Sequence, residues 1–181
     1  MSDSHEPSAP APLIQPRIGA GVYIAPTAYV GGDVTLGDDC TVMHHVVIRG
    51  DVSAIRIGAR VNVQDGAVVH TKTGVDLDLA DDVAIGHRAV VHGRRVGRHT
   101  LIGIGAIVLD DCEIGQDCVI GAGAVLPPGT IVPDGKLALG VPARVIRDLT
   151  AAEREYIDFV LENYLRLNRE HARGRYPAAR T

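Results

Sequence analysis

The 181-residue chain has no tryptophan and a single phenylalanine, so it lacks the aromatic platforms on which nucleic-acid bases stack. Its 22 acidic residues outnumber 18 lysines and arginines, and the formal net charge of −4 also argues against a nucleic-acid partner. No apolar run approaches the length of a membrane span, and no signal-peptide pattern opens the chain. We therefore expect a soluble, cytoplasmic protein that binds neither nucleic acid nor membrane.

Cysteine is scarce as well. The chain has three cysteines, an odd number, and no Cys-x-x-Cys pair; they are Cys40, Cys112 and Cys118. This argues against a disulfide framework and against a thiolate zinc site. All three occupy small-residue positions of the repeat described next, so we expect buried free thiols.

What the sequence does contain is a repeat of six residues. This period fits neither a helix nor an amphipathic strand, but it fits a β-solenoid in which each hexapeptide forms one short strand and a corner. Three hexapeptides would complete one triangular coil. Glycine often follows the aliphatic residue, and we expect it to relieve strained corner backbone. The aliphatic positions are Ile24, Val30, Leu36, Val42 and Ile48; then Ile55, Val61, Ala67, Leu79, Ile85 and Val91; then Val96, Ile102, Val108, Ile114, Ile120, Leu126 and Val132.

The repeat divides the chain into four segments. Residues 1–16 are rich in proline, serine and alanine and predict a flexible tail, and residues 175–181 predict a second tail. Residues 17–148 predict an all-β solenoid, the left-handed parallel β-helix; the handedness follows from a resemblance to the hexapeptide-repeat superfamily. Residues 149–174 predict a C-terminal α-helix packed on the solenoid.

The predicted helix begins with a capping box, Thr150 followed by Glu153, and carries an apolar stripe at helical spacing. We expect it to fold back and cover the last coil, which would otherwise expose apolar side chains and free strand edges. The stripe consists of Ile157, Val160, Leu161, Tyr164 and Leu165.

Three of the eight histidines, His70, His87 and His92, fall close together in the sequence. Three neutral imidazoles form a metal site whose fourth position stays open to water, and such a site yields a hydroxide nucleophile at neutral pH. His70 and His87 are nearly one coil apart, so they could stack on neighbouring coils. A corner separates His87 from His92, so these two should leave different faces. A homotrimer could still gather three histidines around each ion, with one donated by a neighbour.

The surrounding motifs closely resemble the γ-class carbonic anhydrase family, over about residues 18–167. They include "VIRGDVSAIRIGARVNVQDGAVVH" ending at His70, "IGH" ending at His87, "HG" from His92, "LIGIGAIVLDD" at 101–111 and "LGVPARVIR" at 139–147. The resemblance implies reversible hydration of carbon dioxide to bicarbonate by a metal-bound hydroxide at a trimer interface. His70 and His92 of one subunit and His87 of the next would bind zinc, with iron(II) or cobalt as alternatives.

The same resemblance implies further site residues. Arg49, Asp51 and Asp65 would form a charged network near the subunit interface. Gln64 would orient the hydroxide, and Asn62 would help to position carbon dioxide or bicarbonate, because an amide donates and accepts hydrogen bonds without titrating. On the C-terminal helix, Tyr164 is a candidate for the pocket wall.

The chain also departs from the founding members of the family. Val52 stands where they carry an acidic residue, and the link between His70 and His87, "TKTGVDLDLADDVAIG", is short and has no glutamate for proton transfer. Asp76 or Asp78 could substitute, but an ordinary aspartate, with a pKa of about 3.9, is a poor proton shuttle near neutral pH. Metal binding is therefore a safer prediction than turnover.

Three functions stay open. The three histidines with Gln64 favour a carbonic anhydrase, whereas the missing glutamates favour an acyl-CoA thioesterase on the same site or a non-catalytic metal-binding assembly subunit. A fourth candidate function is that of an acyltransferase. We expect solvated or structural roles for the remaining polar candidates, which are His44, His45, His99 and His171, and Asp76, Asp78, Asp81 and Asp82.

Overall fold

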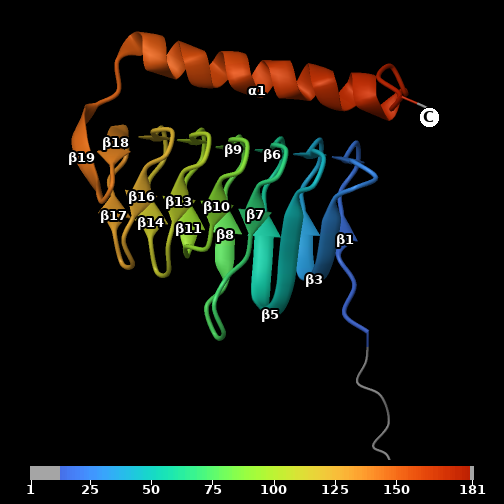
Figure 1. Cartoon of the computed structure of the whole chain (residues 1–181), viewed down its shortest axis with the longest axis horizontal. Helices are drawn as coiled ribbons and strands as arrows, with labels where there is room; N and C mark the ends of the chain where they lie inside the picture. Colours follow the sequence, from blue (N-terminus) through green and yellow to red (C-terminus); the bar gives the residue numbers. More distant parts are fainter. Residues whose placement is uncertain (1–12, 180–181) are drawn as a thin grey trace, which may run out of the picture.

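The computed structural model describes residues 13–179, so residues 1–12 of the predicted N-terminal tail and residues 180–181 of the predicted C-terminal tail lie outside it. Short strands coil into a parallel β-solenoid, and one helix, α1 (Ala151–Ala172), runs along its side (Figure 1). None of the helices in the described part of the chain is long and apolar enough to cross a membrane.

The solenoid has three faces. The first, which we call the helix face, is covered by α1, and its outward side chains include Asn62 and Leu101. Its strands are β2 (Tyr23–Ile24), β4 (Thr41–Val42), β6 (Asn62–Val63), β9 (Ala84–Ile85), β12 (Leu101–Ile102), β15 (Val119–Ile120) and β18 (Lys136–Gly140), which pairs antiparallel with β19 (Ala143–Asp148).

The second and third faces share two long strands, β3 (Tyr29–Leu36) and β5 (Val47–Ile57), which run on from one face to the next. The second, or apolar, face continues with β7 (Val68–Val69), β10 (Val90–Val91), β13 (Ile107–Val108) and β16 (Val125–Leu126). The third, or charged, face contains β1 (Arg17–Ile18), β8 (Leu77–Leu79), β11 (Arg95–Val96), β14 (Glu113–Ile114) and β17 (Ile131–Val132).

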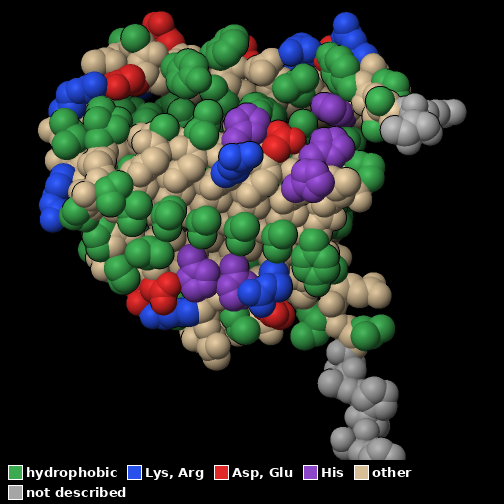
Figure 2. Space-filling model, in the orientation of Figure 1, with side chains coloured by type: hydrophobic (Ala, Val, Ile, Leu, Met, Phe, Trp, Pro, Cys, Tyr) green, Lys and Arg blue, Asp and Glu red, His purple; other side chains and the backbone are tan. Residues whose placement is uncertain are grey.

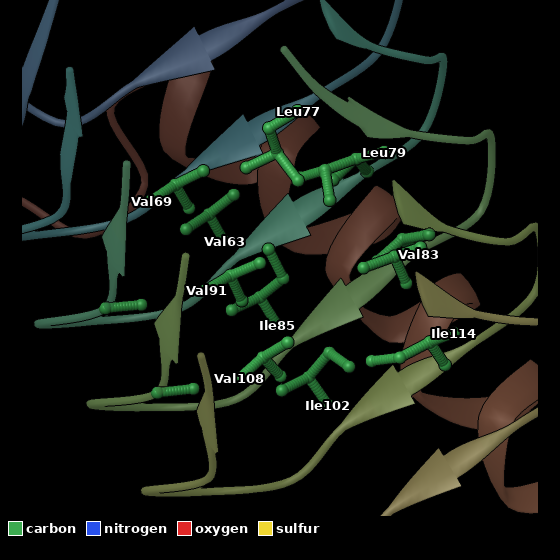
Figure 3. Close-up of a cluster of buried hydrophobic side chains, with 14 of the residues drawn as sticks. Val63, Val69, Leu77, Leu79, Val83, Ile85, Val91, Ile102, Val108 and Ile114 are labelled. Atoms are coloured by element: carbon green, nitrogen blue, oxygen red, sulfur yellow. The ribbon is translucent and has the colours of Figure 1, made fainter. Parts of the chain in front are cut away.

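The interior is a stack of aliphatic side chains, one layer per coil (Figure 3). The register pairs Val42 with Val63 and Val63 with Ile85. The sequence pattern took Val61 in place of Val63, so the first half of its middle run, Ile55, Val61 and Ala67, was shifted by two residues, whereas Leu79, Ile85 and Val91 were in register. Val61 and Val63 are both buried, because each hexapeptide points two residues inward, and the pattern could not tell them apart. The three cysteines fill such inward positions as buried free thiols, as predicted.

The glycines that follow the aliphatic residues have a different role from the one expected. A Cβ on Gly103 would lie 2.6 Å from the backbone nitrogen of Ala122 on the next coil. Close coil-to-coil stacking therefore requires glycine there. The left-handed corner conformation falls two residues later, at Gly105, with φ of +66°.

The helix starts where the sequence predicts, but it does not pack on the part of the solenoid that was expected. Thr150 is its N-cap, and Thr150 and Glu153 form the complete capping box. Instead of covering the last coil, α1 runs back along the helix face to the first coils, where Asn168 donates to the Cys40 carbonyl at 2.7 Å. At 1.5 Å per residue the helix is roughly 30 Å long, about the height of the stacked coils, so it can cover a whole face.

Candidate metal centre

His70 and His92 lie side by side at one edge of the apolar face. Each follows a strand, β7 or β10, and these strands pair in register, Val69 with Val91. His70 Nδ1 and His92 Nε2 are 3.0 Å apart. The expected stacking of His70 on His87 is wrong, because the loop of residues 71–76 lengthens this coil and places residue 92, 22 positions later, over residue 70.

His87 lies at the opposite edge of the apolar face, two residues after β9. The space-filling view shows histidines in two groups, on either side of a row of hydrophobic side chains (Figure 2). Within residues 13–179 of one chain, no group of three or more His, Cys, Asp or Glu side chains is placed to hold a metal ion. The chain therefore brings together two of the three predicted ligands and holds the third apart.

Each of the three imidazoles faces a carboxylate through one ring nitrogen. Such partners fix the tautomer and the ring orientation of histidines that bind metals. The contacts are His70 Nε2 to Asp51 Oδ1 at 3.1 Å, His87 Nδ1 to Asp65 Oδ2 at 3.1 Å, and His92 Nδ1 to Asp110 Oδ1 at 2.7 Å.

This arrangement fits a cation. An ionised carboxylate only accepts hydrogen bonds, so the ring nitrogen that faces it carries the proton and the other nitrogen of a neutral ring carries a lone pair. In neutral His70 and His92 the two lone pairs would then oppose each other across 3.0 Å. A tetrahedral zinc ion, with nitrogens at 2.0–2.1 Å, separates its ligands by about 3.3 Å. The donor set therefore suits a divalent metal shared by this pair.

The predicted charged network is split in the same way. Arg49 Nη1 lies 2.7 and 2.6 Å from the two Asp51 oxygens, beside His70. The hydrogen bond from Arg49 holds the pKa of Asp51 below its usual value, although Asp51 is half exposed. Asp65 lies at the other edge with His87, so one chain joins only two of the three predicted members.

The amide pair lies beneath α1. Asn62 and Gln64 are 2% and 5% exposed, and Gln64 Nε2 donates to Asn62 Oδ1 at 3.1 Å. Among residues 13–179, Asn62 Nδ2 has no hydrogen-bond partner. A buried donor without a partner costs about 1–3 kcal/mol, so this nitrogen calls for an oxygen atom from water or a ligand.

A groove of about 420 Å³ lies between α1 and the helix face. Its lining includes Gln64, His87, Tyr156, Phe159, Asn163 and Tyr164. The Tyr164 hydroxyl is 3.4 Å from His87 Nε2, and burial raises the pKa of Tyr164 to about 12. Tyr164 therefore stays a neutral hydroxyl beside His87, as suits the pocket wall for which it was a candidate.

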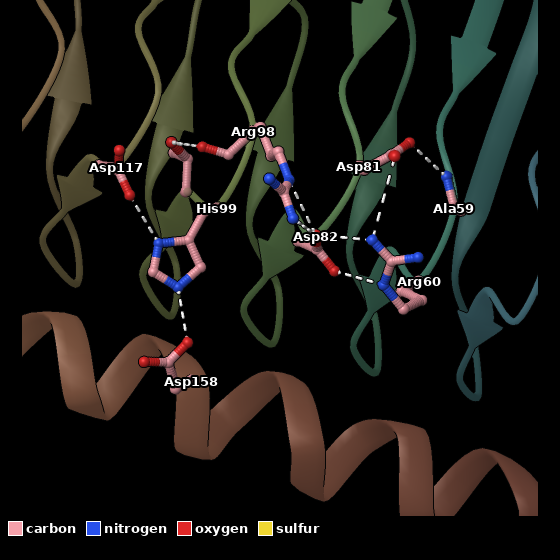
Figure 4. Close-up of polar contacts among 9 residues, drawn as sticks. Ala59, Arg60, Asp81, Asp82, Arg98, His99, Asp117 and Asp158 are labelled. Atoms are coloured by element: carbon pink, nitrogen blue, oxygen red, sulfur yellow. Dashed lines mark hydrogen bonds and ion pairs between the residues drawn. The ribbon is translucent and has the colours of Figure 1, made fainter.

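Sequence reasoning missed Asp110. Asp110 follows His92 by 18 residues, although β10 and β13 pair residues 17 apart, so the short corner after His92 hides the contact from the repeat pattern. The same spacing places Asp117 at His99 Nδ1 (2.8 Å), and the other nitrogen of His99 contacts Asp158 of α1 at 2.9 Å (Figure 4). His99 thus has the structural role that was expected and ties the helix to the solenoid.

The acidic stretch is less solvated than expected. Asp76 accepts a hydrogen bond from the Ala54 backbone at 3.0 Å. Asp82 is buried and pairs with Arg60 at 2.7 Å and Arg98 at 3.0 Å (Figure 4). Burial raises the pKa of Asp82, but the hydrogen bonds from the two arginines outweigh it and the net shift is downward. For Asp82 the prediction of a solvated turn is therefore wrong.

Comparison with known proteins gives the family. Residues 15–50 and 95–128 match the family model "Bacterial transferase hexapeptide (six repeats)". A carbonic anhydrase of Geobacillus kaustophilus is 45% identical over 83% of this chain and 82% of its own. The mitochondrial gamma carbonic anhydrase 2 of Arabidopsis thaliana is 35% identical over 87% of this chain and 59% of its own. A solved hexapeptide transferase family protein from Anaplasma phagocytophilum is 35% identical, with a TM-score of 0.82 and coverage of 86% and 92%.

The fold is thus the predicted left-handed β-helix of hexapeptide-repeat proteins. Within that class, the chain belongs to the γ-class carbonic anhydrase family, as its motifs indicated.

Proposed function

We propose that the protein catalyses the reversible hydration of carbon dioxide to bicarbonate, at zinc-dependent sites shared between the subunits of a homotrimer. One observation carries the proposal: three imidazoles, each backed by a carboxylate, are divided between the two edges of a single apolar face. The carbonic anhydrase of Geobacillus kaustophilus, at 45% identity, supports the reaction.

The three faces support the trimer. One is covered by α1, and another carries outward Arg56, Asp78 and Arg95 and suits water. The apolar face has neither protection. A threefold axis parallel to the solenoid axis would bury the apolar face of every subunit at once. It would also bring the His87 edge of one subunit next to the His70 and His92 edge of its neighbour. Its outward residues are Tyr29, Val47, Val68, Val90, Ile107 and Val125.

In that assembly His70 and His92 of one subunit, with His87 of the partner subunit, would hold the metal. The chemistry that zinc would supply there is the activation of water as a nucleophile toward carbon dioxide; imidazole ligands would also accept iron(II) or cobalt. The chain's own carboxylates keep the three rings oriented, and Arg49 keeps Asp51 ionised.

The remaining roles belong to the groove beside His87. Gln64, whose amide is anchored by Asn62, orients the attacking water. The free Nδ2 of Asn62 donates to an oxygen of carbon dioxide or bicarbonate, which would satisfy the one buried side-chain nitrogen or oxygen without a partner among the described residues. Tyr164 limits the groove beside His87 as an uncharged wall.

The experiment combines metal content, activity and subunit mixing. We expect one zinc per subunit, and stopped-flow hydration of carbon dioxide by the zinc-loaded protein. His87→Ala subunits and His70→Ala/His92→Ala subunits should each bind little zinc. Mixed trimers, verified by mass, should regain some complete sites, because each chain keeps what the other lacks.

Two results would contradict the proposal. Mixed trimers that bind no zinc would exclude shared sites. Full zinc with no hydration at any buffer concentration would exclude the anhydrase, and a screen of acyl-CoA thioesters would then separate a thioesterase from a non-catalytic assembly subunit.

A further inference from the structure

We infer that Asp110 is a positioning residue that holds His92 in the tautomer able to bind a metal; this inference rests on the proposed function of the site. The Asp110 carboxylate is 2.7 Å from His92 Nδ1, the shortest of the three histidine–aspartate contacts at the candidate centre. It requires a proton on Nδ1, and the lone pair then lies on Nε2, the nitrogen that faces His70.

The backbone fixes this contact. β10 and β13 pair in parallel register, and the His92 amide donates to the Val108 carbonyl at 2.8 Å. Asp110 follows two residues later on the stacked coil, at the same corner as His92. Because the two backbones are held by the same ladder, the carboxylate is placed beside the ring.

Among residues 13–179, the carboxylate of Asp110 is also not shared between two side-chain partners. Asp51 shares its carboxylate between Arg49 and His70, whereas the one side-chain partner of Asp110 in residues 13–179 is His92. An undivided anion biases the tautomer most strongly and raises the basicity of the opposite nitrogen. Asp110 should therefore affect ligand strength more than Asp51 does.

The adjacent Asp111 provides a matched control. Its carboxylate pairs with Lys72 and touches none of the three histidines. Asp110→Asn and Asp111→Asn remove the same charge from neighbouring positions, so long-range electrostatics affect both variants alike. An asparagine at 110 can turn its NH₂ group toward Nδ1 and favour the wrong tautomer.

The test measures zinc affinity by chelator competition and the tautomer of His92 by long-range ¹H–¹⁵N NMR of metal-free, histidine-labelled protein. We expect Asp110→Asn to weaken zinc binding by about 10–100-fold and to reduce the Nδ1–H form of His92. Asp111→Asn should change neither by more than about threefold. Thermal unfolding of both variants checks that the solenoid remains folded.

Equal zinc affinities in the two variants, with the His92 tautomer unchanged, would overturn the inference. A wild-type protein that binds no zinc would instead overturn the proposed function, and the NMR measurement would still decide the role of Asp110. The two failures are therefore distinguishable.

Discussion

At the scale of single residues, the Asn62–Gln64 pair allows an effect on catalysis to be distinguished from an effect on metal binding. Gln64 lines the groove with His87 but makes no hydrogen bond to any of the three imidazoles, and its Nε2 is anchored on Asn62. Its side chain can therefore act on the reacting water without holding the ion.

Gln64→Ala should leave the zinc content unchanged and lower kcat/KM for hydration by about tenfold or more, as expected for the loss of one oriented hydrogen-bonding group. Asn163→Ala, which removes another amide from the same groove, should change kcat/KM by less than about threefold. Stopped-flow hydration with metal analysis checks both. Loss of zinc from the Gln64 variant would show that Gln64 supports the metal instead.

The family resemblance grouped His70 with His92, as the structure does, whereas the repeat spacing suggested a pairing of His70 with His87 that is wrong. Counting 17 residues from His70 to His87 assumed coils of constant length, whereas the coil that contains residues 71–76 is longer. Asp110 was not predictable from the repeat alone, because Val91 pairs with Val108, 17 residues on, whereas Asp110 follows His92 by 18. Exact register depends on loop lengths, which a repeat pattern does not give.

At the scale of elements, α1 depends on a capping box with an added ion pair. Glu153 accepts from the Thr150 backbone at 2.8 Å and pairs with Arg147 at 2.7 Å. The hydrogen bond from Arg147, followed by those from Thr150, lowers the pKa of Glu153 to about 2. The N-terminus of the helix is thus held by an anion that ionises more readily when folded.

This shift gives a pH dependence with a definite sign. Because the folded-state pKa is depressed, the stabilisation is fully present above the unfolded value of about 4.3 and is lost as the pH falls toward 2. Glu153→Gln should lower Tm by a few degrees at pH 7, and the difference from wild type should shrink as the pH falls through that window. Glu155→Gln, in the same turn, is the control. A constant difference across pH in thermal melts would contradict the assignment.

For α1, the sequence predicted the start and the length of the helix but not its position on the solenoid. Its start at Thr150 and its length followed from local chemistry, namely the capping box and the apolar stripe. Its place on the solenoid did not, because the stripe matches any apolar surface. Side-chain contacts decide it: Ile157 packs with Leu137 and Leu149 near the last coil, and Asn168 reaches Cys40 on an early one.

At the scale of the whole molecule, the three faces differ in what protects them. The outward residues lie one position before the inward aliphatic ones, so Val68 precedes Val69 and Val90 precedes Val91. Once the register is known, one uncovered apolar face with candidate ligands at both edges argues for a threefold assembly.

Charge on this face should therefore remove the trimer and the metal together. In Val68→Glu/Val90→Glu, closing the trimer would bury six carboxylates without partners, at a cost of several kcal/mol for each buried ion. Neither side chain belongs to the buried core of the solenoid, so circular dichroism should remain that of the wild type. Analytical ultracentrifugation should show monomers, and zinc bound with wild-type affinity should disappear, because His87 no longer meets His70 and His92 of another chain.

The control is Ile131→Glu on the charged face, which makes the same kind of change at a position that is 69% exposed and should leave trimer and zinc intact. Monomers that retain full zinc affinity would mean that one chain completes the site alone, and trimers that survive the double substitution would mean that another face makes the interface.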